Sequence, residues 1–153
     1  MARIVFVVWP MPASVLAGLK IARGLRARGH DVSYIGPASS RKFIEPHGFP
    51  FTPVYVGWLP EEPAADETKD WSVQKRREEA RARSRASVAL LEALASDRDR
   101  ELQDILERAR PDLLIIHSSD FEVIIPSLLA FEAGVVSVYL CSTFARAEAR
   151  SAR

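Results

Sequence analysis

The sequence predicts an α/β fold in which a parallel sheet of about five strands carries helices on both of its faces. Two observations lead to this prediction. Short, continuous apolar runs rich in β-branched residues recur along the chain, and such runs are typical of strands that are covered on both faces. Segments with apolar residues at helical spacing lie between these runs, and an alternation of strands and helices favours a parallel sheet.

Length and composition predict one globular domain that covers residues 1–153. The chain has 153 residues, of which 48% are hydrophobic and 27% are charged, close to the averages of soluble proteins. Domains typically span about 100 to 200 residues. The 21 Lys and Arg residues nearly balance the 20 Asp and Glu residues, which argues against a dedicated nucleic-acid-binding protein.

Cysteine usage and hydropathy argue against several further classes of protein. Cys141 is the lone cysteine, so no internal disulfide forms, and no cluster of Cys and His suggests a metal site. The apolar runs are far shorter than the roughly 20 residues of a transmembrane helix. Pro10 and Pro12 interrupt the first apolar run, which therefore indicates a buried strand and not a secretion signal. We expect a cytoplasmic protein without a transmembrane segment.

A βαβ unit is predicted at the N-terminus. Ile4 to Trp9 forms the first strand, and Ser14 is a candidate N-cap of the amphipathic helix that follows. Gly29 stands where the left-handed residue after a helix is expected, and Asp31 to Ile35 forms the second strand. The crossover in such a unit is almost always right-handed.

The remaining elements are predicted from the same signals. Pro53 either excludes the start of the third segment from the strand or places the strand at a sheet edge, because proline lacks the amide hydrogen that an inner strand donates. Arg110 and Pro111 end the long helical region. In chain order, the predicted segments are a short helix from Ser40 to Glu45, the third strand from Phe51 to Val56, a loop over 57–70, a helical region over 71–109 that breaks at Ser96 and Asp97, the fourth strand from Leu113 to His117, a helix from Glu122 to Glu132, the fifth strand from Val135 to Leu140 and a flexible or truncated tail over 143–153.

The one basic concentration lies in the helical region and consists of Lys75, Arg76, Arg77, Arg81, Arg83 and Arg85. A functional interpretation is contact with anionic lipid or with nucleic acid. Glu78 and Glu79 lie among these residues and weaken that interpretation, since mixed charges are typical of a solvated helix face. We expect no nucleic-acid partner.

Several segments resemble the N-terminal domain of the GT-B glycosyltransferases, in particular the UDP- or TDP-sugar-dependent enzymes that glycosylate natural products and lipids. The resemblance covers most of the chain except 57–100, which is the family's variable region. The matching segments are Arg3-Ile-Val-Phe-Val-Val-Trp-Pro-Met-Pro12, Leu19-Lys-Ile-Ala-Arg-Gly-Leu-Arg-Ala-Arg-Gly-His-Asp-Val32, Gly48-Phe-Pro-Phe-Thr-Pro-Val54, Pro111-Asp-Leu-Leu-Ile-Ile116 and Ala133-Gly-Val-Val-Ser-Val138.

The resemblance implies a Rossmann-like domain that forms the N-terminal half of a two-domain enzyme. In the family, this half binds the acceptor and a C-terminal domain binds the nucleotide-sugar. The chain contains neither the family's donor-binding motif nor a glycine-rich phosphate loop. We therefore expect a fragment that binds no cofactor itself, while a UDP- or TDP-sugar is bound by the missing domain or by a separate donor subunit.

The function implied is transfer of a hexose to the hydroxyl of a small-molecule acceptor, with the chain inactive by itself. Two alternatives remain open on the sequence. The chain is a non-catalytic subunit of a split glycosyltransferase, or it is an unrelated Rossmann-like module that binds a small molecule.

The candidate catalytic residues are Ser14, His117 and Asp120. Inverting glycosyl transfer needs a base, and family members place a histidine after the first strand and an orienting aspartate after the fourth. Ser14 stands where that histidine is expected. Three explanations stay open: the base is His117 or Asp120, the acceptor needs no strong base, or the parent enzyme is inactive. Counting forward from Pro111 places His117 at the position of the family's aspartate, whereas counting back from Gly134 places Asp120 there. Asp120 is the preferred candidate for the site carboxylate.

Ligands of parallel sheets bind beyond the carboxyl ends of the strands, so acceptor contacts are sought there. Aromatic rings at these positions suit apolar ligands. The candidate acceptor-binding residues are Trp9, Pro12, Trp58, Phe121 and Phe144.

Overall fold

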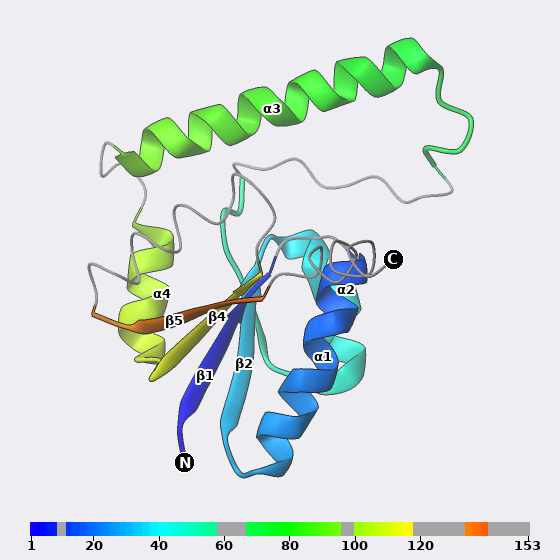
Figure 1. Cartoon of the computed structure of the whole chain (residues 1–153). Coiled ribbons are helices and arrows are strands. Elements are labelled where there is room, and N and C mark those ends of the chain that lie inside the picture. The colour runs from blue at the N-terminus through cyan, green and yellow to red at the C-terminus, as the bar shows by residue number, and fades with distance from the viewer. Residues whose placement is uncertain (9–11, 58–66, 96–99, 118–133, 141–153) are drawn as a thin grey trace, which may run out of the picture.

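The structure is a computed structural model that describes residues 1–8, 12–57, 67–95, 100–117 and 134–140 (Figure 1). Its five strands form one parallel sheet in the order β3-β2-β1-β4-β5. The strands are β1 (Arg3–Val7), β2 (Asp31–Gly36), β3 (Phe51–Pro53), β4 (Leu113–His117) and β5 (Val136–Leu140). The predicted α/β class with five parallel strands is therefore confirmed.

The helices follow the predicted order, with small differences at their ends. They are α1 (Pro12–Ala27), η1 (Ala38–Ser40), α2 (Arg41–Ile44), η2 (Glu45–His47), α3 (Val73–Ala95) and α4 (Glu101–Ala109). The predicted loop lies outside the described residues over 58–66, and so do the break at Ser96 and Asp97, the helix from Glu122 to Glu132 and the tail over 143–153. Within the described part of the chain, no helix is long and apolar enough to cross a membrane.

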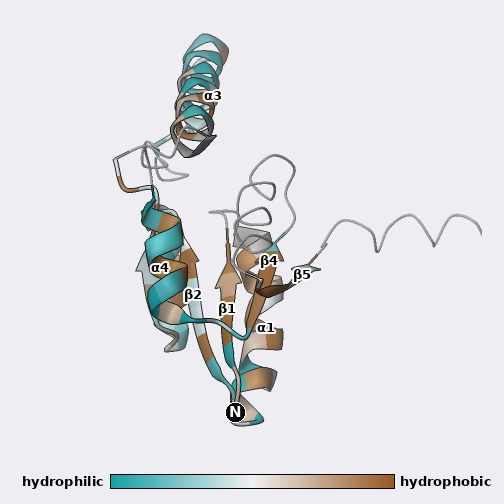
Figure 2. Cartoon of the chain, turned by 90° about the vertical axis from the view of Figure 1, so that its left-hand side faces the viewer, coloured by the Kyte–Doolittle hydropathy of each residue, from teal (hydrophilic) through white to brown (hydrophobic). Residues whose placement is uncertain are grey.

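The sheet is covered on both faces, because side chains of successive strand residues point to opposite sides. On one face, Phe6 and Tyr34 pack with Leu19 of α1 and Ile44 of α2. On the other face, the buried side chains come from the strands, from α4 and from Leu90 of α3. Figure 2 shows α1 and α4 on opposite sides of the sheet.

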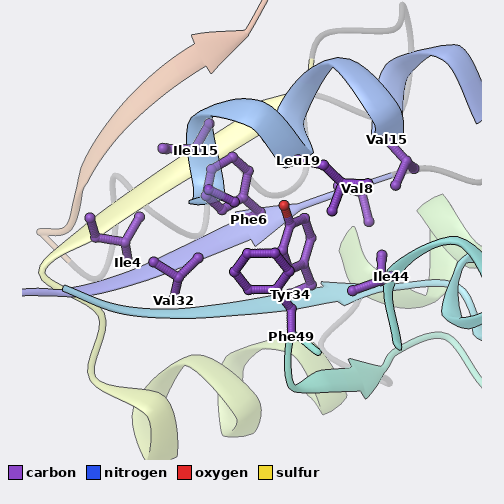
Figure 3. Close-up of a cluster of buried hydrophobic side chains, with 11 residues drawn as sticks. Ile4, Phe6, Val8, Val15, Leu19, Val32, Tyr34, Ile44, Phe49 and Ile115 are labelled. Carbon is purple, nitrogen blue, oxygen red and sulfur yellow. The ribbon is translucent and has the colours of Figure 1, made fainter. Parts of the chain in front are cut away.

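Three aromatic rings form the centre of the α1 side of the core (Figure 3). The rings of Phe6 and Tyr34 stack with their centroids 4.8 Å apart, and the ring of Phe49 meets Tyr34 edge-on at 5.4 Å. The guanidinium carbon of Arg26 lies 4.2 Å from the centroid of the Phe49 ring, and its Nη1 donates to the Gly48 carbonyl at 3.0 Å. These contacts tie the end of α1 to the chain that leads into β3.

The amino edge of the sheet is held by polar contacts. The Arg3 amide donates to Asp112 Oδ2 at 2.7 Å, and the Asp112 amide donates to the Arg3 carbonyl at 2.8 Å. The first of these hydrogen bonds is the main reason that the pKa of the Asp112 carboxyl is lowered. The His30 ring accepts a hydrogen bond from the Ala2 amide at 3.3 Å, so this histidine is structural.

Two local predictions are corrected by the structure. Helix α1 begins at Pro12, so Ser14 is the third helical residue and not the N-cap. Proline suits the first turn of a helix because its φ is already helical and the missing amide hydrogen has no partner there. The third strand ends at Pro53, before the predicted Val56, because Tyr55 turns the chain with a positive φ of 61°. The placement of Pro53 on an edge strand is confirmed.

Replacing Tyr34 with phenylalanine is expected to raise the free energy of unfolding by about 1 kcal/mol. The Tyr34 hydroxyl is fully buried and has no hydrogen-bond partner within the described residues. Burial accordingly raises the pKa of this hydroxyl, with partial opposition from the charges of Arg23 and Arg26. Phenylalanine keeps both ring contacts and removes the unpaired group. Urea unfolding measures the change.

Tyr34→Leu serves as the control, since it removes the hydroxyl together with the ring contacts. It is expected to lower stability by about 1 to 3 kcal/mol. If Tyr34→Phe lowered stability as well, the hydroxyl would have a partner that the described residues do not supply.

Candidate functional site

A hollow lies at the carboxyl edge of the sheet, where the ends of β1, β2 and β4 meet the start of α4. Its volume is about 20 Å³, which is room for about one water molecule, and it opens to solvent. Its wall is mainly apolar and contains Val7, Val54, Leu102 and Ile116, together with His117. The prediction that a site belongs beyond the strand ends is consistent with this position, which we call the carboxyl-edge hollow.

A glycine allows the strands to approach each other closely at the rim of this hollow. A Cβ atom at Gly36 would collide with the Val8 carbonyl oxygen, which is backbone and has no room to yield. The two strands are bonded there, because the Val8 amide donates to the Ile35 carbonyl at 3.0 Å. The Gly36 carbonyl in turn accepts from the Val54 amide at 2.9 Å. Gly36 therefore brings the ends of β1, β2 and β3 together.

Tyr55 forms another part of the wall in an unusual backbone conformation. Its φ of 61° lies in the left-handed region, which is costly for an aromatic residue. The Tyr55 amide donates to Glu101 Oε2 at 2.6 Å, so a carboxylate at the start of α4 holds the turn in place. This bond links the end of β3 to α4 across the hollow. The sequence carries no signal for it, because the two residues lie far apart in the chain.

His117, the last residue of β4, lines this hollow together with Tyr55. It is only 6% exposed, and neither ring nitrogen has a hydrogen-bond partner among the described residues. Burial lowers the pKa of the imidazole, since removal from water penalises its charged form. At neutral pH the ring is therefore neutral, with one nitrogen available as a proton acceptor.

The other predicted site residues are described less fully. Pro12 and Ser14 lie in the first turn of α1, which starts at the carboxyl edge of the sheet, but their side chains lie outside the described part of the structure. The remaining predicted residues, Asp120, Trp9, Trp58, Phe121 and Phe144, also lie outside it. Within the described residues, no group of three or more His, Cys, Asp and Glu residues is arranged to hold a metal ion.

Residues that line the hollow also include some that the sequence did not suggest. Val54, Tyr55 and Leu102 belong to segments predicted as strand and helix, where apolar residues are expected in the core. Gly36 directly follows the predicted second strand, and its close contact with Val8 depends on how β1 and β2 pair. None of these roles has a local sequence pattern.

The fold is shared with solved glycosyltransferase structures. The spinosyn rhamnosyltransferase SpnG matches with a TM-score of 0.60 and 18% identity over 92% of this chain and 34% of its own. The Streptomyces sp. SF2575 glycosyltransferase SsfS6 matches with a TM-score of 0.57 and 21% identity over 92% and 39%. The MurG of Acinetobacter baumannii matches with a TM-score of 0.61 and 11% identity over 92% and 35%.

The chain has the fold of a GT-B glycosyltransferase domain. It spans little more than a third of the length of these proteins. Comparisons with protein-family models and with curated proteins found no match. The likeness therefore confirms the predicted fold, and the activity of the chain is treated below as a proposal.

Lowering the pH from about 7.5 to about 5.5 is expected to destabilise the wild-type chain more than His117→Asn. The folded pKa of His117 lies below the unfolded value of about 6.5, so the unfolded chain binds the proton first as the pH falls. Stability is then lost below about pH 6.5 at no more than about 1.4 kcal/mol per pH unit, and the loss ends below the folded pKa. Urea unfolding across this pH range measures how the free energy of unfolding changes with pH in the wild type and in His117→Asn. Equal pH dependence of the two proteins would contradict the burial of a neutral His117.

Replacing Gly36 with alanine is expected to lower the free energy of unfolding by about 1 to 3 kcal/mol, because the new Cβ forces the ends of β1 and β2 apart. Gly24→Ala is the matched control. Its Cβ would lie 3.2 Å from the flexible end of Arg28, and alanine favours a helix interior by about 0.5 to 1 kcal/mol. Thermal or urea unfolding measures the stability of both variants. The close contact would be refuted if Gly36→Ala were as stable as Gly24→Ala or more stable.

Proposed function

We propose that this chain is the N-terminal, acceptor-binding domain of a nucleotide-sugar-dependent glycosyltransferase that transfers a hexose to a hydroxyl of a small molecule. The observation that carries the proposal is that the buried His117, which lines the carboxyl-edge hollow of a GT-B fold, has no hydrogen-bond partner among the described residues. Structures of SpnG in complex with thymidine diphosphate and with spinosyn aglycone support the same chemistry.

In the proposed reaction, the oxygen of the acceptor hydroxyl attacks the anomeric carbon of the donor. A neutral His117 takes the proton of that hydroxyl during the attack. The new carbon–oxygen bond forms as the bond to the nucleotide diphosphate breaks, and the diphosphate leaves with the electron pair. Burial favours this role because it keeps the imidazole unprotonated at neutral pH. Asp120 is proposed to orient the ring and stabilise its cation, and Ser14 to contribute a hydroxyl at the start of α1.

The apolar wall of the hollow fits an acceptor that presents one hydroxyl on an apolar body. Tyr55, Leu102 and Ile116 form the apolar part of the wall and offer contact to such a body. The proposed acceptor contacts further along this edge are Trp9, Pro12, Trp58, Phe121 and Phe144.

The donor, a UDP- or TDP-sugar, is proposed to bind to a C-terminal domain or to a separate donor subunit. The 153-residue chain alone is then expected to bind acceptor without transferring sugar. A cytoplasmic location is part of this proposal.

Acceptor binding by the chain tests the proposal. NMR titration with apolar hydroxyl compounds, including the spinosyn aglycone, is expected to shift the His117 ring signals. Tyr55→Gly removes the ring and relieves the positive φ, and it is expected to weaken binding about 10-fold, as loss of one buried aromatic contact predicts.

Tyr139→Ala is the matched control, because Tyr139 is half-exposed on β5 and does not line the hollow. It is expected to leave the affinity unchanged. Equal losses in the two variants, or shifts that spare His117 for every compound, would exclude the hollow as the acceptor site. Turnover of UDP-glucose by the chain alone would exclude the proposed division of labour.

A further inference from the structure

Helix α3 carries a row of exposed arginines that the proposed glycosyl transfer does not use. In both views the helix lies beyond the carboxyl ends of the strands (Figures 1 and 2), and Leu90 near its C-terminal end packs into the core. Arg77, Arg81 and Arg85 follow one another at four-residue spacing, so they share one side of the helix. All three are exposed, and none has an ion pair or hydrogen bond within the described residues.

The neighbouring charges of α3 are engaged elsewhere. The Gln74 amide donates to Glu78 Oε1 at 3.0 Å, and Glu79 is partly buried on the side of the helix that carries Leu90. Lys75 lies over the Trp71 ring at 4.6 Å. Arg76 donates to the Trp71 carbonyl at 3.2 Å and thereby fixes the start of the helix. Within the described part of the chain, neither acid forms an ion pair with the three arginines.

Exposed apolar residues stand at both ends of this row. Val73, about one helical turn before Arg77, is 67% exposed. Val88, three residues after Arg85, is 52% exposed. The five residues form a stripe about 22 Å long at a rise of about 1.5 Å per residue. We call Val73, Arg77, Arg81, Arg85 and Val88 the α3 stripe.

We propose that the α3 stripe docks the protein on an anionic lipid bilayer. Guanidinium groups bind phosphate in a bidentate manner, and each basic residue near an anionic bilayer strengthens binding several-fold. The two valines reach the headgroup region while the longer arginines keep their charge at the surface. A straight stripe on the side of α3 that faces away from Leu90 fits a flat surface. This inference does not depend on the proposed glycosyl transfer.

The same features favour lipid over nucleic acid. The whole chain has a net charge of only +1, so the basic excess is confined to this stripe and does not extend over a wider face. The stripe also lacks the aromatic side chains on which single-stranded bases stack.

The full 153-residue chain is tested by flotation with vesicles of phosphatidylcholine containing about 30% phosphatidylglycerol, and with vesicles of phosphatidylcholine alone. The wild type is expected to bind the anionic vesicles, and about 0.5 M salt is expected to release it because salt screens exposed charges. The triple variant Arg77→Gln, Arg81→Gln, Arg85→Gln is expected to bind on the order of 100-fold more weakly. Replacement of the same arginines by lysine is expected to retain most of the binding.

The matched control is Lys20→Gln, Lys69→Gln, Arg108→Gln, which removes three exposed charges away from the stripe. Both triple variants change the net charge from +1 to −2, since each loses three positive charges. The control is expected to bind within a few-fold of wild type, and circular dichroism checks that both variants fold. The proposal is overturned if the wild type does not bind anionic vesicles, if both variants lose binding equally, or if a single-stranded oligonucleotide binds the stripe more tightly than the vesicles do.

Discussion

The pairing of β1 with a parallel neighbour on each side is the constraint on which the rest of the structure depends. Phe6 lies opposite Tyr34 of β2 and opposite Ile115 of β4, so one strand aligns both halves of the sheet. Because β1 is apolar on both faces, it requires a helical layer on each side. The same register brings Val8, Gly36 and His117 to one edge, and the carboxyl-edge hollow follows from it.

The polar groups of the molecule are distributed unequally between the two edges of the sheet. At the amino edge, the Arg3 amide donates a hydrogen bond to the Asp112 carboxylate, and the Asp112 amide donates one to the Arg3 carbonyl. Such a reciprocal pair is typical of a structural contact. At the carboxyl edge, the buried His117 ring has no partner within the described residues. Burying a polar group without a partner is costly, and such groups often mark a place where a ligand completes the hydrogen bonds.

Helix α3 shows how tertiary packing sorts a mixed charge pattern. In the sequence, acids and bases alternate closely enough to read as an ordinary solvated helix. The fold turns Glu79 toward the partly buried side and leaves Arg77, Arg81 and Arg85 together on the exposed side. One end of the helix is anchored by Leu90, which is packed into the core. The molecule thus separates a hollow lined by the buried His117 from a basic helix surface.

The sequence by itself determined the order of the elements and the class of the fold, because apolar runs and helical periodicity are local signals that the parallel sheet requires. It also placed His117 at a strand end, since that residue directly follows an apolar run. Only the tertiary structure decided that this ring is buried, that Tyr55 turns back to meet Glu101, and that Gly36 must lack a side chain. Each of these depends on contacts between residues from different strands and helices, and such contacts have no local pattern.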